Sequence, residues 1–180
     1  KSLENLGLDY VDLYLIHWPA EGYVEVYLEM EKLQKEGLTR NIGVSNFRKS
    51  HLQNLLSKVH IVPSINQIET NPQMVDEETI QYCKENKIGV EAWSPLGSGA
   101  CLNNPKIQEI ANKYQKSSAQ IILRWLLQKG IVILPKSVHE NRIKENIDLF
   151  NFVLENEDVE LINQLNQHKR TGPDPDNFDF

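Results

Sequence analysis

Two cations and a hydroxyl stand close together behind a short apolar run in the last third of the chain. Lys136 and Ser137 directly follow the run at residues 131–135, and Arg142 lies a short distance further on. The run predicts a short buried strand, and the pattern behind it predicts a loop that opens a helix. Free N–H groups and the helix dipole favour an anion at such a position, and the cations add to that preference. These residues indicate a site for a phosphate ester.

The same residues also have a purely structural interpretation. Ser137 and Glu140 have the spacing of a capping box, in which two side chains satisfy the first N–H groups of a helix. Arg142 and Lys144 would also suit a solvated helix face. These residues alone do not decide between the two interpretations.

Composition narrows the class of protein. The chain has 180 residues and a formal net charge of -6, so we expect a single domain over residues 1–180 with a sizeable core. The acidic balance argues against nucleic acid or an anionic membrane as the main partner, and no apolar run approaches the length of a membrane span. Cys83 and Cys101 fit neither a disulfide framework nor a metal motif, and we expect ordinary thiols in a reducing cytoplasm.

Strand and helix patterns alternate along the chain. The first residues resemble the end of a helix with Gly7 near its C-terminal cap, and the tail from Gly172 is too rich in proline to be helical. Strands are predicted at 11–16, 40–44, 63–68, 88–93 and 131–134. Helices are predicted at 24–36, 51–59, 76–86, 105–114, 141–150 and 158–167, with a further one behind a capping box of Ser117 and Gln120. Nearly all-apolar strands separated by helices predict a parallel sheet that is covered on both faces.

Two architectures fit this alternation, an open doubly wound sheet and a (β/α)8 barrel. The open sheet would favour a glycine-rich turn after its first strand, and no G-x-G-x-x-G occurs here. Polar or aromatic side chains instead stand at all five strand ends, and in a barrel they would converge on the C-terminal rim, where active sites lie. They are His17 and Trp18, Ser45 and Asn46, Gln67 and Glu69, Trp93 and Ser94, and Lys136 and Ser137.

A barrel has eight strands and about 250 residues. This chain supplies five predicted strands, so we expect it to be the C-terminal part of a barrel, namely its last five βα units. The first three strands would then precede Lys1.

Five motifs occur in order on the five predicted strands, and together they resemble the aldo-keto reductase family from end to end of the chain. Asn71 departs from the family, which usually has histidine before Pro72, and we expect little consequence. The tryptophan in Ala92-Trp93-Ser94-Pro95 and the ending from Gly172 are similar to the microbial branch of diketogluconate and glyoxal reductases. The motifs are Leu13-Tyr14-Leu15-Ile16-His17-Trp18-Pro19, Ile42-Gly43-Val44-Ser45-Asn46-Phe47, Asn66-Gln67-Ile68-Glu69, Trp93-Ser94-Pro95-Leu96-Gly97, and Leu134-Pro135-Lys136-Ser137 with Arg142, Glu145 and Asn146.

The resemblance implies a role for each matching residue. His17 would orient the substrate carbonyl and donate a hydrogen bond to it, with Trp18 beside the substrate. Trp93 would stack on the nicotinamide ring. The resemblance places Ser45, Asn46 and Gln67 at the nicotinamide carboxamide; Ser94, Leu96, Gly97 and Ser98 at the pyrophosphate; Lys136, Ser137 and Arg142 at the adenosine 2′-phosphate; and Glu145 and Asn146 near the adenine.

The implied activity is the NADPH-dependent reduction of small aldehydes and ketones, without a metal, by a protein that is a monomer at full length. Two cations at a phosphate favour NADPH over NADH, and Arg142 can make planar bidentate contacts. The family's proton-donating tyrosine, with its lysine and aspartate, would lie on the strands before Lys1, so we expect no turnover from these residues alone. Two alternatives stay open: a non-catalytic nucleotide-binding or structural barrel remnant, and a phosphate-binding barrel with unrelated chemistry. An exposed Trp93 argues against the latter.

Overall fold

The computed structural model describes residues 1–178 of the chain. They form an α/β fold whose five strands hydrogen-bond in chain order, β1-β2-β3-β4-β5. The chain divides into two compact units. The first comprises Lys1–Ile68, Glu77–Val90 and the segment from Pro175 onward, and the second comprises Glu69–Asp76 and Glu91–Asp174.

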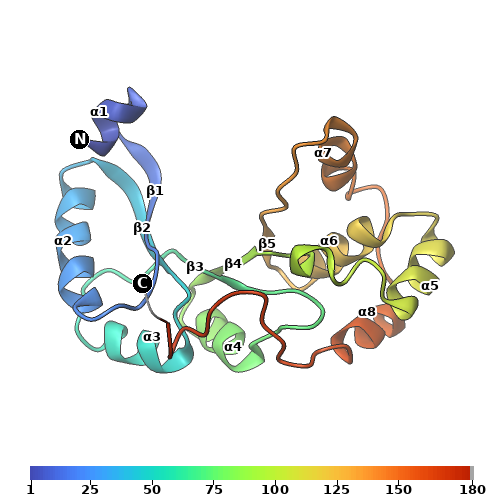
Figure 1. Ribbon diagram of the computed structural model, residues 1–180. Coiled ribbons are helices and arrows are strands. Elements are labelled where there is room, and N and C mark those ends of the chain that lie inside the picture. The colour runs from blue at the N-terminus through green and yellow to red at the C-terminus, as the bar shows by residue number, and fades with distance from the viewer. Residues whose placement is uncertain (179–180) are drawn as a thin grey trace. The chain divides into compact units, whose positions relative to one another are not determined.

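The strands can be followed in chain order in Figure 1. Neighbouring strands pair in parallel in β1–β2, β2–β3 and β4–β5. The predicted parallel sheet is therefore confirmed for these strands, and β1 has the predicted bounds. The five strands are β1 Val11–Ile16, β2 Thr39–Ser45, β3 Ile65–Glu69, β4 Gly89–Trp93 and β5 Val132–Ile133.

The first unit contains α1 Ser2–Leu6, α2 Tyr23–Lys35, α3 Lys49–Leu56 and α4 Glu77–Glu85. Gly7 ends α1 in the left-handed conformation at φ 65°, as predicted. Helix α2 contacts β1 and β2, and α3 contacts α4. Burial of an apolar side chain contributes about 1.5–3 kcal/mol, and the largest fully buried side chains of this unit are Tyr27, Ile42, Phe47, Leu52 and Leu55.

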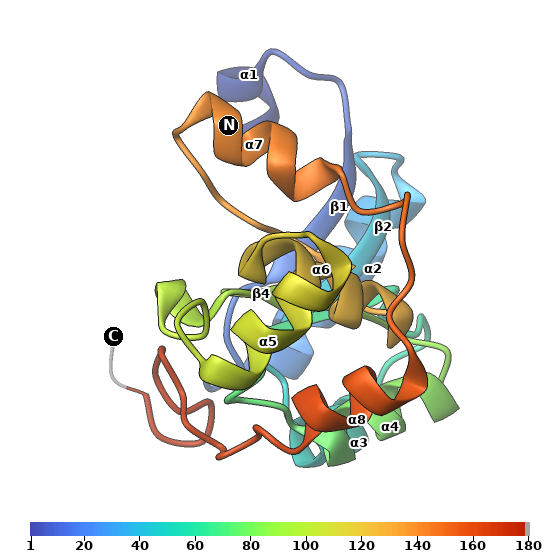
Figure 2. The same ribbon diagram turned by 90° about the vertical axis from the view of Figure 1, so that its right-hand side faces the viewer.

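The second unit contains α5 Pro105–Tyr114, α6 Ser118–Gln128, α7 Glu140–Ile147, α8 Asn156–Asn163 and the short 3-10 helix Gly97–Gly99. Its core is built on α6, which contacts α5, α7 and β5, and Figure 2 shows α5, α6 and α8 close together. The indole N–H of Trp125 in α6 donates to Asn163 in α8 at 2.9 Å. Five apolar side chains of α6 are buried, namely Ile121, Ile122, Leu123, Trp125 and Leu126.

The predicted capping box of α6 is confirmed. The hydroxyl of Ser117 accepts from the N–H of Gln120 at 3.2 Å, and the Gln120 side chain accepts from the N–H of Ser117 at 3.1 Å. The first turn of α6 therefore begins at the residue that the sequence indicated.

Within residues 1–178, β1 and β5 are less buried than the other strands and lie at the edges of the sheet, as expected for five strands of a barrel. Tyr14 in β1 is 46% exposed and Val132 in β5 is 48% exposed. These strands stand first and last in the hydrogen-bonding order, so within residues 1–178 each has a single strand neighbour. Apolar composition predicted the strands correctly, but it carries no information on whether a strand lies at an edge.

Candidate functional site

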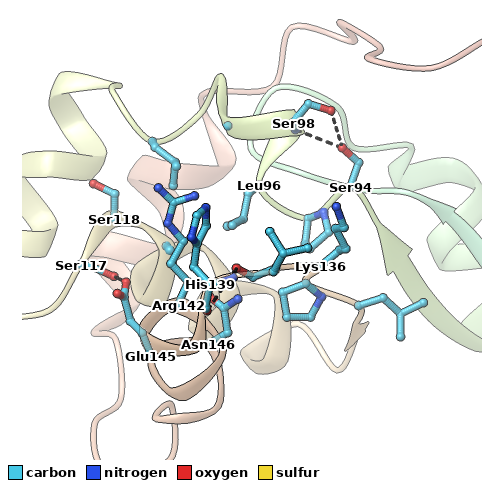
Figure 3. A pocket seen from close by; sticks show the side chains of 18 of the residues that line it. Ser94, Leu96, Ser98, Ser117, Ser118, Lys136, His139, Arg142, Glu145 and Asn146 are labelled. Atoms are coloured by element: carbon cyan, nitrogen blue, oxygen red, sulfur yellow. Dashed lines mark hydrogen bonds between the residues drawn. The ribbon is translucent and has the colours of Figure 1, made fainter.

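A cleft of about 760 Å³ opens in the second unit, where the ends of β4 and β5 meet the first turns of α6 and α7. Figure 3 shows side chains that line it. The register places Ala92 beside Ile133, so the residues just past both strands lie at similar height. Eight residues that the sequence nominated for the cofactor line this cleft, namely Ser94, Leu96, Ser98, Lys136, Ser137, Arg142, Glu145 and Asn146.

The cationic part of the cleft comes from the end of β5 and the first turns of α7. Lys136 and Arg142 both line the cleft, and no ion pair of either is found within residues 1–178. Lys144, the other cation of α7, forms an ion pair with Glu140 at 2.7 Å instead. The cleft therefore presents an ammonium and a guanidinium that form no ion pair with a carboxylate of the described residues.

The opposite wall of the cleft is the N-terminus of α6. The hydroxyl of Ser117 donates a short hydrogen bond to the carboxylate of Glu145 in α7, and the pair is drawn in Figure 3. Because Ser117 is itself fixed as the cap of α6, Glu145 is held in one orientation at the rim.

The loop after β4 has an unusual backbone. Ser94, Gly97, Ser98 and Gly99 have φ values of 50°, 58°, 53° and 92°, which L-residues other than glycine and asparagine rarely adopt. The Ser94 hydroxyl accepts from the N–H of Ser98 at 3.1 Å, which ties the turn together. Ser94 and Ser98 are thereby presented side by side at the cleft (Figure 3).

Gly97 does not line the cleft, unlike its neighbours in this loop. It is buried, and a side chain there would have its Cβ 2.8 Å from Sγ of Cys101. Asn71, the departure from the family pattern, lies behind the same loop, and its Oδ1 accepts from the N–H of Gln73 at 3.0 Å. Burial raises the pKa of the Cys101 thiol, which suits a packing role.

The capping box proposed for Ser137 and Glu140 is wrong. Helix α7 begins at Glu140 with His139 as its N-cap residue, and no side chain caps it. The hydroxyl of Ser137 accepts instead from the N–H of His139 at 3.1 Å. Ser137 therefore ties the turn before α7 rather than capping the helix, and it also lines the cleft.

Sequence reasoning missed five further polar residues of the cleft, namely Asn103, Gln108, Ser117, Ser118 and His139. His139 could have been predicted as a cleft residue, because it lies between Lys136 and Arg142 at the start of a helix. Ser117 was assigned only a capping role, and nothing in the sequence indicates its contact with Glu145.

A second group of nominated residues lies in the first unit, at the carboxyl ends of β1, β2 and β3. The register pairs Ile16 with Val44 and Ser45 with Gln67. The Ser45 hydroxyl donates to the carbonyl of Gln67 at 2.8 Å. The Asn46 amide, whose backbone has φ 64°, donates to the carbonyl of His17 at 2.9 Å. These contacts bring Ser45 and Asn46, which are buried, next to the backbone of His17 and Gln67, of which His17 is exposed and Gln67 half-buried.

Trp18 follows His17 with ring centroids 6.2 Å apart. The ring of Phe178 packs on Trp18 at 4.9 Å between centroids. The carboxylate of Asp176 forms an ion pair with Arg48, and one of its oxygens lies 3.4 Å from Nε2 of His51. The end of the described chain is thus attached to the first unit beside two of the nominated residues. The prediction that both groups of residues line one site stays a prediction.

The described residues form an α/β fold with a parallel sheet, and comparison with known proteins identifies the family. The profile of the Aldo/keto reductase family matches residues 1–167. The chain belongs to the aldo/keto reductase family. Within residues 1–178 no group of three or more His, Cys, Asp or Glu residues is arranged to hold a metal ion. In the same residues no helix has the length and apolarity to cross a bilayer.

Three relatives illustrate the similarity. The chain is 53% identical to the oxidoreductase YtbE of Bacillus subtilis and 50% identical to the glyoxal reductase of the same organism, over 99% and 100% of its length. It spans 64% and 66% of those two proteins. A crystal structure of a silkworm (Bombyx mori) aldo-keto reductase in complex with NADP superposes with a TM-score of 0.90 at 41% identity, over 97% of this chain and 64% of that one.

Proposed function

We propose that the protein carrying this chain is an NADPH-dependent reductase of small aldehydes and ketones. The observation that carries the proposal is the cleft that holds Lys136, Ser137 and Arg142 at the start of α7. The proposal includes a complete (β/α)8 barrel as a single domain, to which residues 1–180 contribute the last five βα units.

The side chains of the cleft fit a phosphorylated dinucleotide by their chemistry. A guanidinium forms bidentate bonds with phosphate, and an ammonium adds a point charge. The first turn of α7 adds N–H groups that no side chain caps. We assign Lys136, Ser137 and Arg142 to the 2′-phosphate, and Ser94, Leu96 and Ser98 to the pyrophosphate. Gly97, which is buried behind the cleft, would contribute to the pyrophosphate site only by shaping this loop. Glu145 and Asn146 belong near the adenine. When bound, NADPH supplies the hydride.

The remaining residues would bind and orient the reacting groups. Ser45, Asn46 and Gln67 hold the nicotinamide carboxamide, and the ring of Trp93 stacks on the nicotinamide. His17 donates a hydrogen bond to the substrate carbonyl oxygen, where negative charge develops during reduction. Trp18 forms one wall of the substrate site.

The proposed substrate class rests on the similarity to known reductases. A glyoxal reductase is 50% identical to this chain, and small aldehydes and dicarbonyls are therefore the first substrates to test. We further propose a cytoplasmic monomer whose partners are small molecules and include neither nucleic acid nor membranes.

A second candidate function is nucleotide binding without catalysis. This candidate is favoured because, among the described residues, no tyrosine near His17 in the sequence is placed to donate a proton to a substrate. The hydroxyl of Tyr23 donates to the carbonyl of His51, and Tyr27 is fully buried. Tyr14 lies within β1 rather than at its end, and Tyr10 precedes β1 with its ring under the guanidinium of Arg40. None of these tyrosines suits a proton donor beside His17.

The two candidates separate in one experiment on the full-length protein. NADPH absorbance is followed with a panel of aldehydes and ketones, and NADPH binding is measured by fluorescence titration. Oxidation of NADPH that depends on an aldehyde supports the reductase. Binding without turnover supports the second candidate, and the absence of binding overturns both.

A further inference from the structure

A buried carboxylate at the end of β3 holds the C-terminal segment of the second unit. Glu69 is 2% exposed. Its carboxylate accepts a hydrogen bond from the N–H of Thr171 at 2.7 Å and a short one from the Thr171 hydroxyl. The N–H of Gly172 approaches the other oxygen at 3.4 Å. We call these contacts the Glu69 clamp.

The Glu69 clamp links residues that are far apart in the chain. Burying a carboxylate is unfavourable unless donors satisfy its oxygens. Three of the donors here belong to Thr171 and Gly172, and the fourth, the Asn71 amide, is at 3.5 Å. The position of the segment and the satisfaction of Glu69 therefore depend on each other.

The clamped segment lies against the residues that end β4. A Cβ atom on Gly172 would stand 2.5 Å from Cη2 of Trp93 and 3.3 Å from Cζ3, so the glycine backbone touches the six-membered ring. The hydroxyl oxygens of Thr171 and Ser94 lie 3.3 Å apart. Only glycine permits this approach, and the segment forms a support for one part of the indole.

We propose that Glu69 is a positioning residue for cofactor binding, which acts by holding Thr171 and Gly172 against Trp93. The inference rests on the proposed function, in which the Trp93 ring stacks on the nicotinamide. An indole without its support has more orientations available, and the stack then requires ordering that the clamp otherwise provides in advance.

Two ligands test the inference in the full-length protein. NADPH reaches both Trp93 and the cationic cleft, whereas adenosine 2′,5′-bisphosphate has no nicotinamide and needs the cleft alone. We expect Glu69→Ala to weaken NADPH binding about tenfold, the order of magnitude of one aromatic stacking contact. Binding of adenosine 2′,5′-bisphosphate should stay unchanged.

Two matched variants separate positioning from general stability. Glu69→Gln keeps an acceptor oxygen for Thr171 and should retain most of the NADPH affinity. Gly172→Ala leaves the carboxylate in place but directs a methyl group into the Trp93 ring, and we expect the same selective loss for NADPH. It also keeps the inference testable if Glu69→Ala fails to fold.

A double-mutant cycle tests whether Glu69 acts through Trp93. In the Trp93→Ala background, Glu69→Ala should weaken NADPH binding by less than twofold, because the ring that it positions is gone. A full tenfold additional loss in that background overturns the inference.

The remaining outcomes are equally informative. Equal losses for both ligands in Glu69→Ala, or no loss for either, overturn the inference while leaving the proposed function intact. If the unsubstituted protein binds neither ligand, the proposed function fails and the inference fails with it.

Discussion

Arg142 and Lys144 stand two positions apart on α7 and differ in their surroundings. Arg142 lines the cleft, whereas Lys144 forms an ion pair with Glu140. Both side chains are exposed cations of the same helix. This contrast makes them a natural test and control for the phosphate site.

We expect Arg142→Ala to weaken NADPH binding far more than NADH binding, because NADH lacks the 2′-phosphate. Charge-assisted hydrogen bonds contribute about 1.5–3 kcal/mol, and for an exposed arginine we expect the low end, about a tenfold loss. Fluorescence titration with both cofactors measures the difference.

The control for this prediction is Lys144→Ala, which removes the same charge from the same helix. It should change neither affinity by more than about twofold, as is usual for an exposed ion pair. Equal losses for NADPH and NADH in Arg142→Ala would show that the arginine acts elsewhere.

Many of the residues that line the cleft could be named from the sequence. Residues that directly follow β4 and β5 were found because parallel strands end at the same edge of a sheet. Ser117 could not be found in this way, because its contact with Glu145 depends on how α6 packs beside α7. The burial of Gly97 could not be predicted either, because the motif gives the residue types of the loop but not which of them face the cleft.

The elements were predicted best where a local signal marked their ends. Gly7 and the Ser117 capping box ended and began helices as expected. The predicted ends of α7 and α8 were each too late, since the structure ends them at Ile147 and Asn163 rather than at residues 150 and 167. Neither helix has a side-chain cap at its start. The exposure of β1 and β5 follows from their places first and last in the strand order, as expected for five strands of a barrel.

Helices α5 and α8 are joined by a polar contact with a defined pH dependence. Asp158 in α8 is buried, and it accepts from Tyr114 at 2.6 Å and from Lys113 at 2.8 Å. Burial by itself would raise the pKa of Asp158, but the hydrogen bonds from Lys113 and Tyr114 outweigh it and lower the pKa. A carboxyl group with a lowered pKa stabilises the fold in its ionised form.

We expect Asp158→Asn to lower the melting temperature of the full-length protein at neutral pH by a few degrees. The contribution of Asp158 is fully present above its unfolded pKa of about 3.9 and is lost as the pH falls through the lower folded pKa. Thermal unfolding at several pH values should therefore show the two proteins converging below about pH 4.

Glu155→Gln is the matched control for this prediction. Glu155 binds the same Lys113 at 2.6 Å, but its side chain is 65% exposed. Its removal should shift the melting temperature little. A pH-independent difference between the original protein and Asp158→Asn would mean that packing, not ionisation, accounts for the effect.

On the scale of the whole molecule, five parallel strands are fewer than the eight of a closed (β/α)8 barrel. The sheet therefore has two edges within residues 1–178, at β1 and β5. Asp12 places a charge on β1, while β5 and its flank present Val132 and Leu134, both more than 40% exposed. Exposed apolar edges favour association with other chains.

We expect a polypeptide of these 180 residues alone to have no measurable reductase activity and to be poorly soluble. The first expectation follows from the lack of a suitable proton donor near His17, and the second from the exposed edges. Size-exclusion chromatography and an NADPH assay on the purified polypeptide measure both. A stable monomer that reduces an aldehyde would contradict the prediction, and one of its own residues would then have to supply the proton.

The left-handed backbone of Asn46, Ser94 and Ser98 has a consequence for evolution and engineering. Non-glycine residues in this conformation cost of order 1 kcal/mol each. The fold is therefore less stable because of three residues that we propose as cofactor contacts. Glycine at Ser98 would relieve that cost and raise the melting temperature, yet it would remove a hydroxyl from the cleft. Selection for thermostability alone should thus drift toward glycine here and weaken the cofactor site, a trade-off between stability and function.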